Sequence, residues 1–134
     1  MTNDQIPMTN EITMTQTSNK KYDLRERTAK FGETIISLAK RITENSVTRP
    51  LISQLVRAGT SVGANYCEAD DASTKKDFLY KIGTCRRESK ESKHWLRMIT
   101  TAIPYLENEA KLLLCEAQEL NLIFSAIINR SQNK

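Results

Sequence analysis

The chain has 134 residues, and its 20 Lys and Arg against 16 Asp and Glu give a formal net charge of +4 at neutral pH. This length suits one domain with a single modest core and argues against two domains. Only four glycines and three prolines are present, and apolar residues recur at helical spacing, so we predict an all-α protein. The positive charge favours acidic partners, with nucleic acid and an anionic surface both fitting.

The cysteines Cys67, Cys85 and Cys115 lie far apart, with no C-x-x-C pair and no neighbouring histidine, which excludes a recognisable zinc site. Each falls on or beside an expected core stripe, so we expect buried thiols in a reducing compartment. No secretory signal is visible at the N-terminus, and no uninterrupted apolar stretch approaches the roughly 20 residues of a membrane helix. We therefore expect a soluble, cytoplasmic protein with no cofactor, no metal and no membrane contact.

Residues 1–21 are polar and rich in Thr and Asn, with too little apolar surface to offset the entropy of ordering them. We expect a flexible tail there.

A first helix is expected to begin near Asp23, which can cap it. Its core residues recur at steps of seven, four, three and four, namely Leu24, Phe31, Ile35, Leu38 and Ile42. The connection to the next helix is expected at 45–49.

A second helix is expected to start at Pro50, because the missing N–H of proline would be unpaired in a first turn in any case. Its expected core residues are Leu51 or Ile52, then Leu55, Val62, Tyr66 and Ala69. The middle of this helix is small-sided and consists of Ala58, Gly59, Thr60, Ser61, Gly63 and Ala64. Two interior glycines cost about 1 kcal/mol each relative to alanine. Close approach of another helix, within the subunit or across an interface, is the expected compensation.

The stretch 73–101 predicts a third helix with two unlike faces. Ser73 is the expected N-cap, and Asp77 in the first turns favours the helix dipole. One face is an apolar and small-residue stripe made of Phe78, Ile82, Cys85, Ser89, Ser92, Leu96 and Ile99. The remaining surface carries what we call the basic ridge, made of Lys75, Lys76, Arg86, Arg87, Lys90, Lys93 and Arg97. Between Thr74 and Arg97, eight cations oppose three acids, which gives +5 and leaves −1 for all other residues.

Pro104 separates this segment from a fourth helix expected from about Tyr105 to Asn129. Its core residues again step by four and three, namely Leu106, Ala110, Leu113, Ala117, Leu120, Phe124 and Ile127. Four helices with short connections predict an antiparallel, up-down-up-down four-helix bundle over residues 22–131, with 132–134 disordered. The seven-residue spacing indicates left-handed, near-parallel packing.

The run from Gln54 to Ile99 resembles the bacterial four-helix-bundle proteins associated with intervening sequences of 23S ribosomal RNA genes. These are similar to the accessory variability proteins of diversity-generating retroelements. The resemblance covers about residues 22–131 and departs at Ala69-Asp70, where many relatives have glycine. It is carried by Arg57, Ser61, Asn65, Glu68, Asp77, Phe78, Arg87, Glu88, Glu91, Trp95 and Leu96. It implies a ring-like homo-oligomer, a pentamer, with a basic surface that binds nucleic acid and with no established catalytic activity.

A flank of the third helix suits a seam between helices or between subunits. Glu88, Glu91 and Trp95 each lie one residue before a core position, and we predict that Arg57 pairs with one of the two glutamates. The alternative is a set of ordinary surface charges, since exposed ion pairs contribute only roughly 0–1 kcal/mol. The candidate interface or structural residues are Arg57, Ser61, Asn65, Glu68, Glu88, Glu91 and Trp95. Oligomerisation is expected because this flank, the small-sided segment and the apolar Leu79 and Tyr80 exceed what one core can hide.

His94, the only histidine, permits two catalytic interpretations. Glu91 and His94 match the Glu-x-x-His of di-iron bundles, but such a site needs a second copy, which the sequence lacks. Arg87 and His94 have a spacing similar to that of HEPN-type ribonucleases, and they share a helix face. The leading hypothesis is a non-enzymatic bundle whose basic ridge contacts nucleic-acid phosphates. The alternatives are a scaffold for a protein such as a reverse transcriptase, and a solvated face with no partner.

Overall fold

The computed structural model describes residues 23–132, which form four α-helices and a short 3-10 helix, with no strand in that range. The helices are α2 (Leu24–Ala39), α3 (Thr48–Asp70), α4 (Lys75–Ala102), η1 (Pro104–Leu106) and α5 (Glu107–Gln132). The predicted all-α class and the four helices are confirmed. The expected tail at 1–21 and residues 133–134 lie outside the described residues. Gln132 was expected to be disordered but ends α5.

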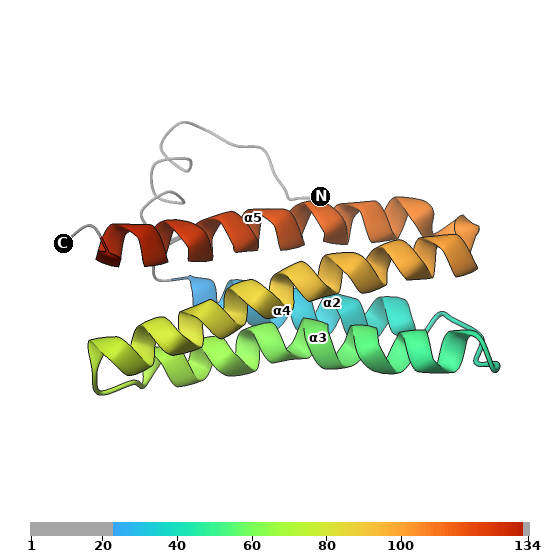
Figure 1. The fold of residues 1–134 in the computed structure, drawn as a ribbon. Helices are drawn as coiled ribbons and strands as arrows, with labels where there is room; N and C mark the ends of the chain where they lie inside the picture. The colour runs from blue at the N-terminus through green and yellow to red at the C-terminus, as the bar shows by residue number, and fades with distance from the viewer. Residues whose placement is uncertain (1–22, 133–134) are drawn as a thin grey trace.

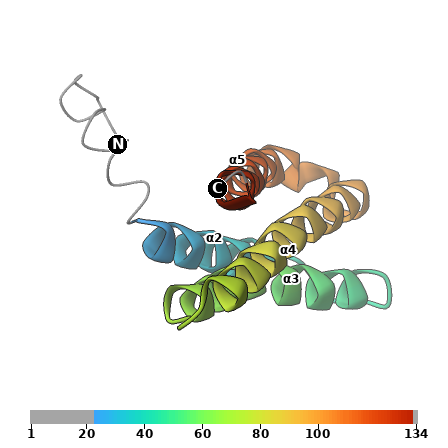
Figure 2. The same ribbon diagram turned by 60° about the vertical axis from the view of Figure 1, so that its left-hand side comes forward.

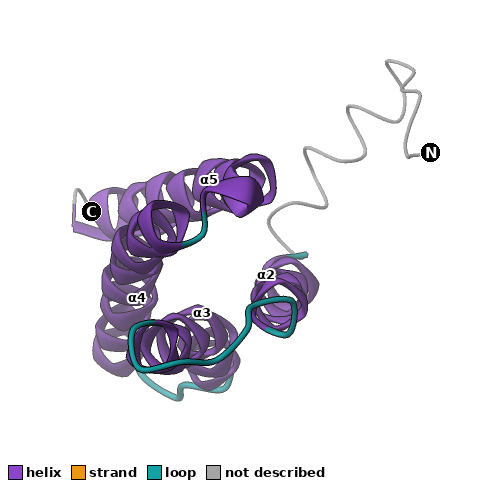
Figure 3. Ribbon diagram, turned by 90° about the vertical axis from the view of Figure 1, so that its right-hand side faces the viewer, coloured by secondary structure: helices purple, strands orange, loops and turns teal. Residues whose placement is uncertain are grey.

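Each helix packs on the helix that follows it in sequence, whereas α2 and α5 share a much smaller contact. In Figure 1 the colour progresses from left to right along α2 and α4, and from right to left along α3 and α5. Figure 2 shows α4 running obliquely, so that it begins against α3 and ends beside α5. Viewed end on, the helices follow one another around the core as an arc from α2 to α5 (Figure 3).

The core stripe expected on α4 is largely confirmed. Six of its seven residues are buried, namely Ile82, Cys85, Ser89, Ser92, Leu96 and Ile99, while Phe78 is half-buried against the core. On α5 the expected stripe is buried from Leu106 to Phe124, but its last member is Ile128 and not Ile127. A straight helix has 3.6 residues per turn, so a strict seven-residue pattern drifts away from the core over several turns.

The helix ends differ from the sequence prediction because local hydrogen bonds decide them. The helix α2 ends at Ala39, and Ile42 is buried from the connection that follows. The helix α3 begins at Thr48, two residues before Pro50, because Asn45 Oδ1 accepts the Thr48 N–H at 2.9 Å. Asp23 precedes α2, but its side chain makes no capping hydrogen bond.

Thr74, and not the expected Ser73, caps α4. Thr74 has the extended backbone of an N-cap residue, and its hydroxyl oxygen accepts the Asp77 N–H at 3.1 Å. The expected role of Asp77 in the first turn is therefore confirmed, and the cap lies one residue later than the sequence indicated.

The small-sided segment of α3 packs against α2 within the same chain. A Cβ added at Gly59 would lie 2.8 Å from Cγ1 of Ile35, and one at Gly63 would lie 3.3 Å from the backbone of Thr28. The first contact is closer than Cβ atoms come to other atoms in proteins, and the second is tighter than most such contacts. The two glycines of α3 therefore let α2 approach closely, which is the intrachain form of the expected compensation.

The three cysteines lie in different environments. Cys85 is fully buried, its Sγ lies 3.5 Å from the Val62 carbonyl oxygen, and burial raises the pKa of its thiol to about 12. Cys67 is half-buried and Cys115 is exposed. The expectation of a buried thiol is wrong for Cys115. Two residues turn a helix through about 200°, so Cys115 lies across the helix from the buried Ala117.

The outer surface of α5 is unusually apolar. Leu112 and Leu122 are 75% and 57% exposed. Among the described residues, Pro104–Gln132 is the one helical stretch long and apolar enough to cross a membrane by length and composition. The core helix of a globular protein passes the same test, and Leu113, Ala117 and Phe124 of α5 do lie in the core.

Candidate nucleic-acid interface

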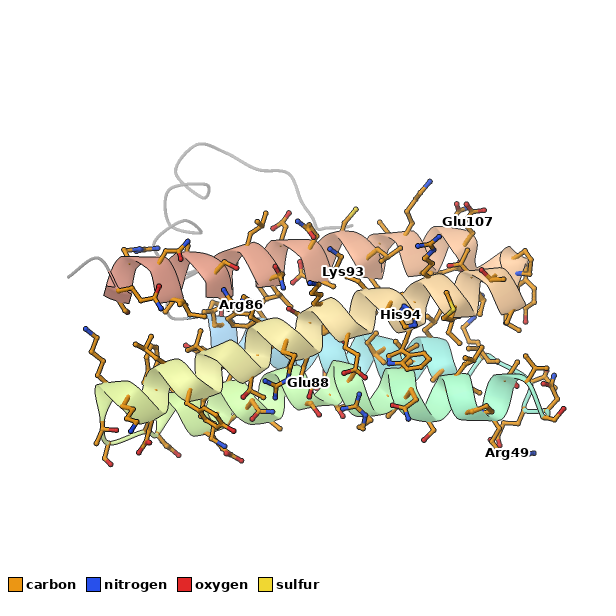
Figure 4. All side chains as sticks on the ribbon, viewed as in Figure 1. Arg49, Arg86, Glu88, Lys93, His94 and Glu107 are labelled. Carbon is orange, nitrogen blue, oxygen red and sulfur yellow. The ribbon has the colours of Figure 1, made fainter. Side chains whose placement is uncertain are left out.

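The basic ridge follows α4 along the side that faces away from the core. Six of its seven residues are exposed, and Lys93 is half-buried. In Figure 4, Arg86 and Lys93 point to the side of α4 that faces α5, whereas Glu88 points to the side that faces α3. The ridge and the acidic flank of α4 are therefore separated around the helix, as the sequence spacing predicted.

No residue of the basic ridge makes an ion pair with a carboxylate in the described part of the chain. Lys75 Nζ donates to the carbonyl oxygen of Ser131 at 3.3 Å, and Lys93 Nζ donates to the side-chain oxygen of Gln118. Both acceptors are neutral, so they do not cancel the charge of the lysines. The ridge keeps its full positive charge at the surface.

The arginines of α2 and of the turn that follows it are arranged in the opposite way. Arg27 contacts Glu116 through two nitrogens, at 2.7 and 2.9 Å, and Glu119 through one at 2.7 Å. The contact with Glu116, and after it the contact with Glu119, raises the pKa of Arg27 above its ordinary value. Burial of the side chain acts in the opposite direction. Arg25 pairs with Asp70 in the same manner, at 2.6 Å.

The predicted pairing of Arg57 is confirmed. Arg57 contacts both glutamates, whereas one was expected. Arg57 Nη1 lies 3.2 Å from Glu88 Oε1, and Arg57 Nη2 donates to Glu91 Oε2. The Trp95 indole N–H donates to the same oxygen at 3.0 Å. The Trp95 hydrogen bond, followed by the contact with Arg57, lowers the pKa of Glu91. We call Arg57, Glu88, Glu91 and Trp95 the Arg57 network.

The remaining candidate interface residues contact groups within the chain. Ser61 Oγ donates to the Arg57 carbonyl oxygen at 2.7 Å, and Asn65 Nδ2 donates to the Ser61 carbonyl oxygen at 2.9 Å. Glu68 pairs with Lys81 at 2.5 Å, which joins α3 to α4. Lys81 of α4 therefore has a carboxylate partner, in contrast to the cations of the basic ridge. A role of these residues between subunits stays a prediction.

The buried hydroxyls of Ser89 and Ser92 donate to carbonyl oxygens of α4 itself. Ser92 Oγ donates to the Glu88 carbonyl oxygen and Ser89 Oγ to the Arg86 carbonyl oxygen, both at 2.8 Å. Asn121 on α5 donates to the Arg86 carbonyl oxygen at 3.0 Å. Asn121 could not be identified from the sequence, because a lone polar residue beside a core stripe has no distinctive spacing.

His94 is exposed beside Trp95, with 4.9 Å between ring centroids and an angle of 74° between ring planes. Arg87 is also exposed, one heptad earlier on the same side of α4. No group of three or more His, Cys, Asp or Glu residues suited to a metal ion occurs between residues 23 and 132. The chemistry that this surface offers is therefore charge and exposed rings.

The described residues define an all-helical protein of four packed helices, in which α4 carries a row of cations without a carboxylate partner in that range. The chain belongs to the family of 23S rRNA-intervening sequence proteins, whose model matches residues 20–126. A comparison with curated proteins gives no match.

Among solved structures, the chain is similar to a protein of unknown function from the S23 ribosomal protein family of Bacteroides thetaiotaomicron VPI-5482. The two are 25% identical, with a TM-score of 0.69, over 78% of this chain and 97% of that one. The resemblance to the family of intervening-sequence proteins is thereby confirmed. The resemblance to the accessory variability proteins of retroelements stays a prediction.

Proposed function

We propose that this protein is a non-enzymatic, oligomeric nucleic-acid-binding protein whose basic ridge contacts the phosphate oxygens of RNA or DNA. The observation that carries the proposal is that all seven cations of the ridge lack a carboxylate partner in the described residues, while Lys81 on the same helix has one. Cations that are already paired would have to break an ion pair before meeting a phosphate. Unpaired cations contact phosphate directly, and the release of condensed counterions then favours binding.

We propose further that the helices form an antiparallel, up-down-up-down bundle and that the bundles assemble into a ring of five subunits, as the family resemblance implies. Apolar surface left uncovered by the chain supports self-association. Leu112 and Leu122 on α5 are exposed, and an apolar groove of about 310 Å³ lies between α2 and α3 beside Ile36 and Gly63. Symmetry would repeat the ridge around the assembly and strengthen weak individual contacts. A monomer in light scattering would contradict this part of the proposal.

The test is binding to labelled single-stranded RNA, duplex RNA and duplex DNA across a salt series. Each phosphate contact contributes about 0.7 to 0.9 to the slope of log affinity against log salt concentration. The double charge reversal Lys90→Glu with Arg97→Glu is expected to lower the affinity and to flatten this slope by roughly 1.4 to 1.8. An unchanged affinity and slope would show that the ridge is not the site.

A matched control is the double reversal Lys30→Glu with Lys40→Glu. Both lysines are exposed on or just after α2, and the variant changes the net charge by the same amount. We expect it to leave the slope close to that of the wild type. An equal loss in both variants would mean that net charge alone, and not the ridge, governs binding.

Other outcomes of the same experiment decide between the alternatives. No binding at low salt would assign the ridge to an acidic protein surface, such as that of a reverse transcriptase, or to solubility. Cleavage of the RNA would revive Arg87 and His94 as a ribonuclease pair, which the loss of cleavage in His94→Ala would establish.

A further inference from the structure

Two exposed rings lie in line with a cation of the basic ridge. Tyr80, Arg87 and His94 are spaced by seven residues, so they follow one line along the surface of α4. The Tyr80 side chain is 68% exposed, and its ring is approached by Lys81 Nζ at 5.9 Å from the centroid. With a rise of 1.5 Å per residue, Tyr80 and His94 are about 21 Å apart along the helix.

The Arg57 network holds the His94 ring at the surface. Arg57 binds the Glu91 carboxylate, which accepts the Trp95 indole N–H, and the Trp95 ring packs at an angle against His94. Each of these contacts restricts the next side chain. The network therefore reduces the entropy that the His94 ring would lose on binding a planar group, which is how preorganisation raises affinity.

The surroundings of His94 favour a ligand that carries both flat rings and negative charge. Lys90 lies one turn before His94 and Arg97 one turn after it, so both are neighbours on the helix surface. The nearest acid on that surface is Glu91, whose carboxylate is already engaged by Arg57 and Trp95. A flat group on the His94 ring would thus have cations on two sides and no free carboxylate next to it.

We propose that the basic ridge binds single-stranded nucleic acid, with bases stacking on Tyr80 and His94 and the phosphates between them contacting Arg87 and Lys90. This inference rests on the proposed function and specifies its substrate class. The bases of a duplex are stacked on one another, whereas those of a single strand are free to stack on aromatic and imidazole rings. A positively charged surface that alternates with such rings is the usual construction of single-strand sites, which cover about 4 to 16 nucleotides.

The test compares the variants Tyr80→Ala and His94→Ala with the wild type on a single-stranded oligonucleotide and on a duplex of the same sequence. Loss of one stacked base is expected to weaken single-strand binding about 5- to 150-fold. The salt slope should stay unchanged, because no phosphate contact is removed. The variants Tyr80→Phe and His94→Phe keep a ring and are expected to restore most of the affinity.

Tyr105 provides a matched control, because it is 69% exposed, similar to Tyr80, but lies in η1 beyond the end of the ridge. Tyr105→Ala is expected to bind like the wild type. A second readout is the fluorescence of Trp95, the only tryptophan, which packs against His94. Single-stranded oligonucleotide should change this emission, and His94→Ala should reduce the change. Circular dichroism confirms that each variant is folded.

The outcomes separate this inference from the proposed function. If Tyr80→Ala and His94→Ala bind single strands like the wild type while the reversal of Lys90 and Arg97 abolishes binding, stacking is wrong and the ridge stands. Tighter binding of the duplex than of the single strand would also overturn the inference alone. If neither form of nucleic acid binds at low salt, both proposals fail.

Discussion

The arginines of α2 and the cations of α4 are the same kind of residue used in two ways. Arg25 and Arg27 each hold a carboxylate on another helix, whereas the basic ridge on α4 holds none in the described residues. The first set joins helices, and the second leaves its charge available to a partner. A count of charges therefore does not separate cations that join helices from cations that are free to meet a partner, whereas the contacts of each charge do.

Arg27 lies at the small contact between α2 and α5. These two helices share little packing surface, and Arg27 crosses between them to Glu116 and Glu119. Its side chain is only 16% exposed, so its ion pairs are less screened by water than those on the open surface. On α4, by contrast, packing against α3 and α5 is extensive, and none of the cations of the basic ridge pairs with a carboxylate of another helix in the described residues.

The largest effect on stability is expected at Arg27. The variant Arg27→Ala leaves two carboxylates of α5 without their cation, and hydrogen bonds between charged groups contribute about 1.5 to 3 kcal/mol each when lost. We expect the free energy of unfolding, measured with urea, to fall by an amount of that order, while nucleic-acid binding is retained. If folded Arg27→Ala lost nucleic-acid binding, Arg27 would not be a purely structural cation, and the contrast with the basic ridge would be wrong.

Arg41 supplies the matched control for Arg27. It pairs with Glu109 at 2.9 Å, but both side chains are about half exposed, at 52% and 42%. The contact lowers the pKa of Glu109, yet exposed pairs contribute only about 0 to 1 kcal/mol. Arg41→Ala should therefore shift the urea midpoint little. A shift as large as that of Arg27→Ala would mean that burial does not set the strength of these pairs.

Gly59 and Gly83 allow a similar test of a packed position against an open one. Gly59 faces Ile35 across the contact of α2 with α3, so Gly59→Ala adds an overpacking cost of about 1 to 3 kcal/mol against a gain in helix propensity of about 1 kcal/mol. We expect a net loss of up to about 2 kcal/mol. Gly83 has nothing within 4 Å of an added Cβ, and Gly83→Ala should stabilise the protein by about 1 kcal/mol. Urea unfolding measures the change in the free energy of unfolding for each variant. Changes of the same sign would contradict the packing described.

The smallest effect is expected from pH at Glu91. Its pKa in the folded protein is lowered by Trp95 and Arg57, below the ordinary value of about 4.3 for a glutamate in an unfolded chain. The contribution of Glu91 to stability is therefore complete above that value and is lost as the pH falls through the lowered pKa. Urea midpoints of the wild type and Glu91→Gln should differ at pH 7, and the difference should shrink as the pH falls below the ordinary glutamate value and through the lowered pKa. A difference that is constant with pH would show that the ionised carboxylate is not what Glu91 contributes.

Much of the fold could be predicted because it depends on local periodicity. The buried residues of α4 and α5 follow the spacing of apolar residues, and the separation of the ridge from the core stripe follows from the same geometry. A pairing of Arg57 with one of the two glutamates could also be predicted, since both glutamates lie on a flank of α4 and Arg57 is on the preceding helix. The contact with both at once could not.

The remaining features depend on contacts between segments far apart in sequence or on the exact orientation of one side chain. The partners of Arg27 lie 89 and 92 residues later, and no spacing rule connects them. The choice of Thr74 over Ser73 as a cap depends on which of two adjacent hydroxyls meets the Asp77 N–H. The exposure of Cys115, by contrast, could have been predicted, because Cys115 lies midway between the expected core residues Leu113 and Ala117 and two residues turn a helix through about 200°.

The order in which the helices contact one another also bears on how the chain reaches this structure. Most contacts join helices that are adjacent in sequence, and the pair most distant in sequence, α2 and α5, shares few. Local contacts require little loop closure, and proteins rich in them fold within microseconds to milliseconds. Each helix can therefore add to the one made before it during synthesis, and α5 completes the structure without threading past any other segment.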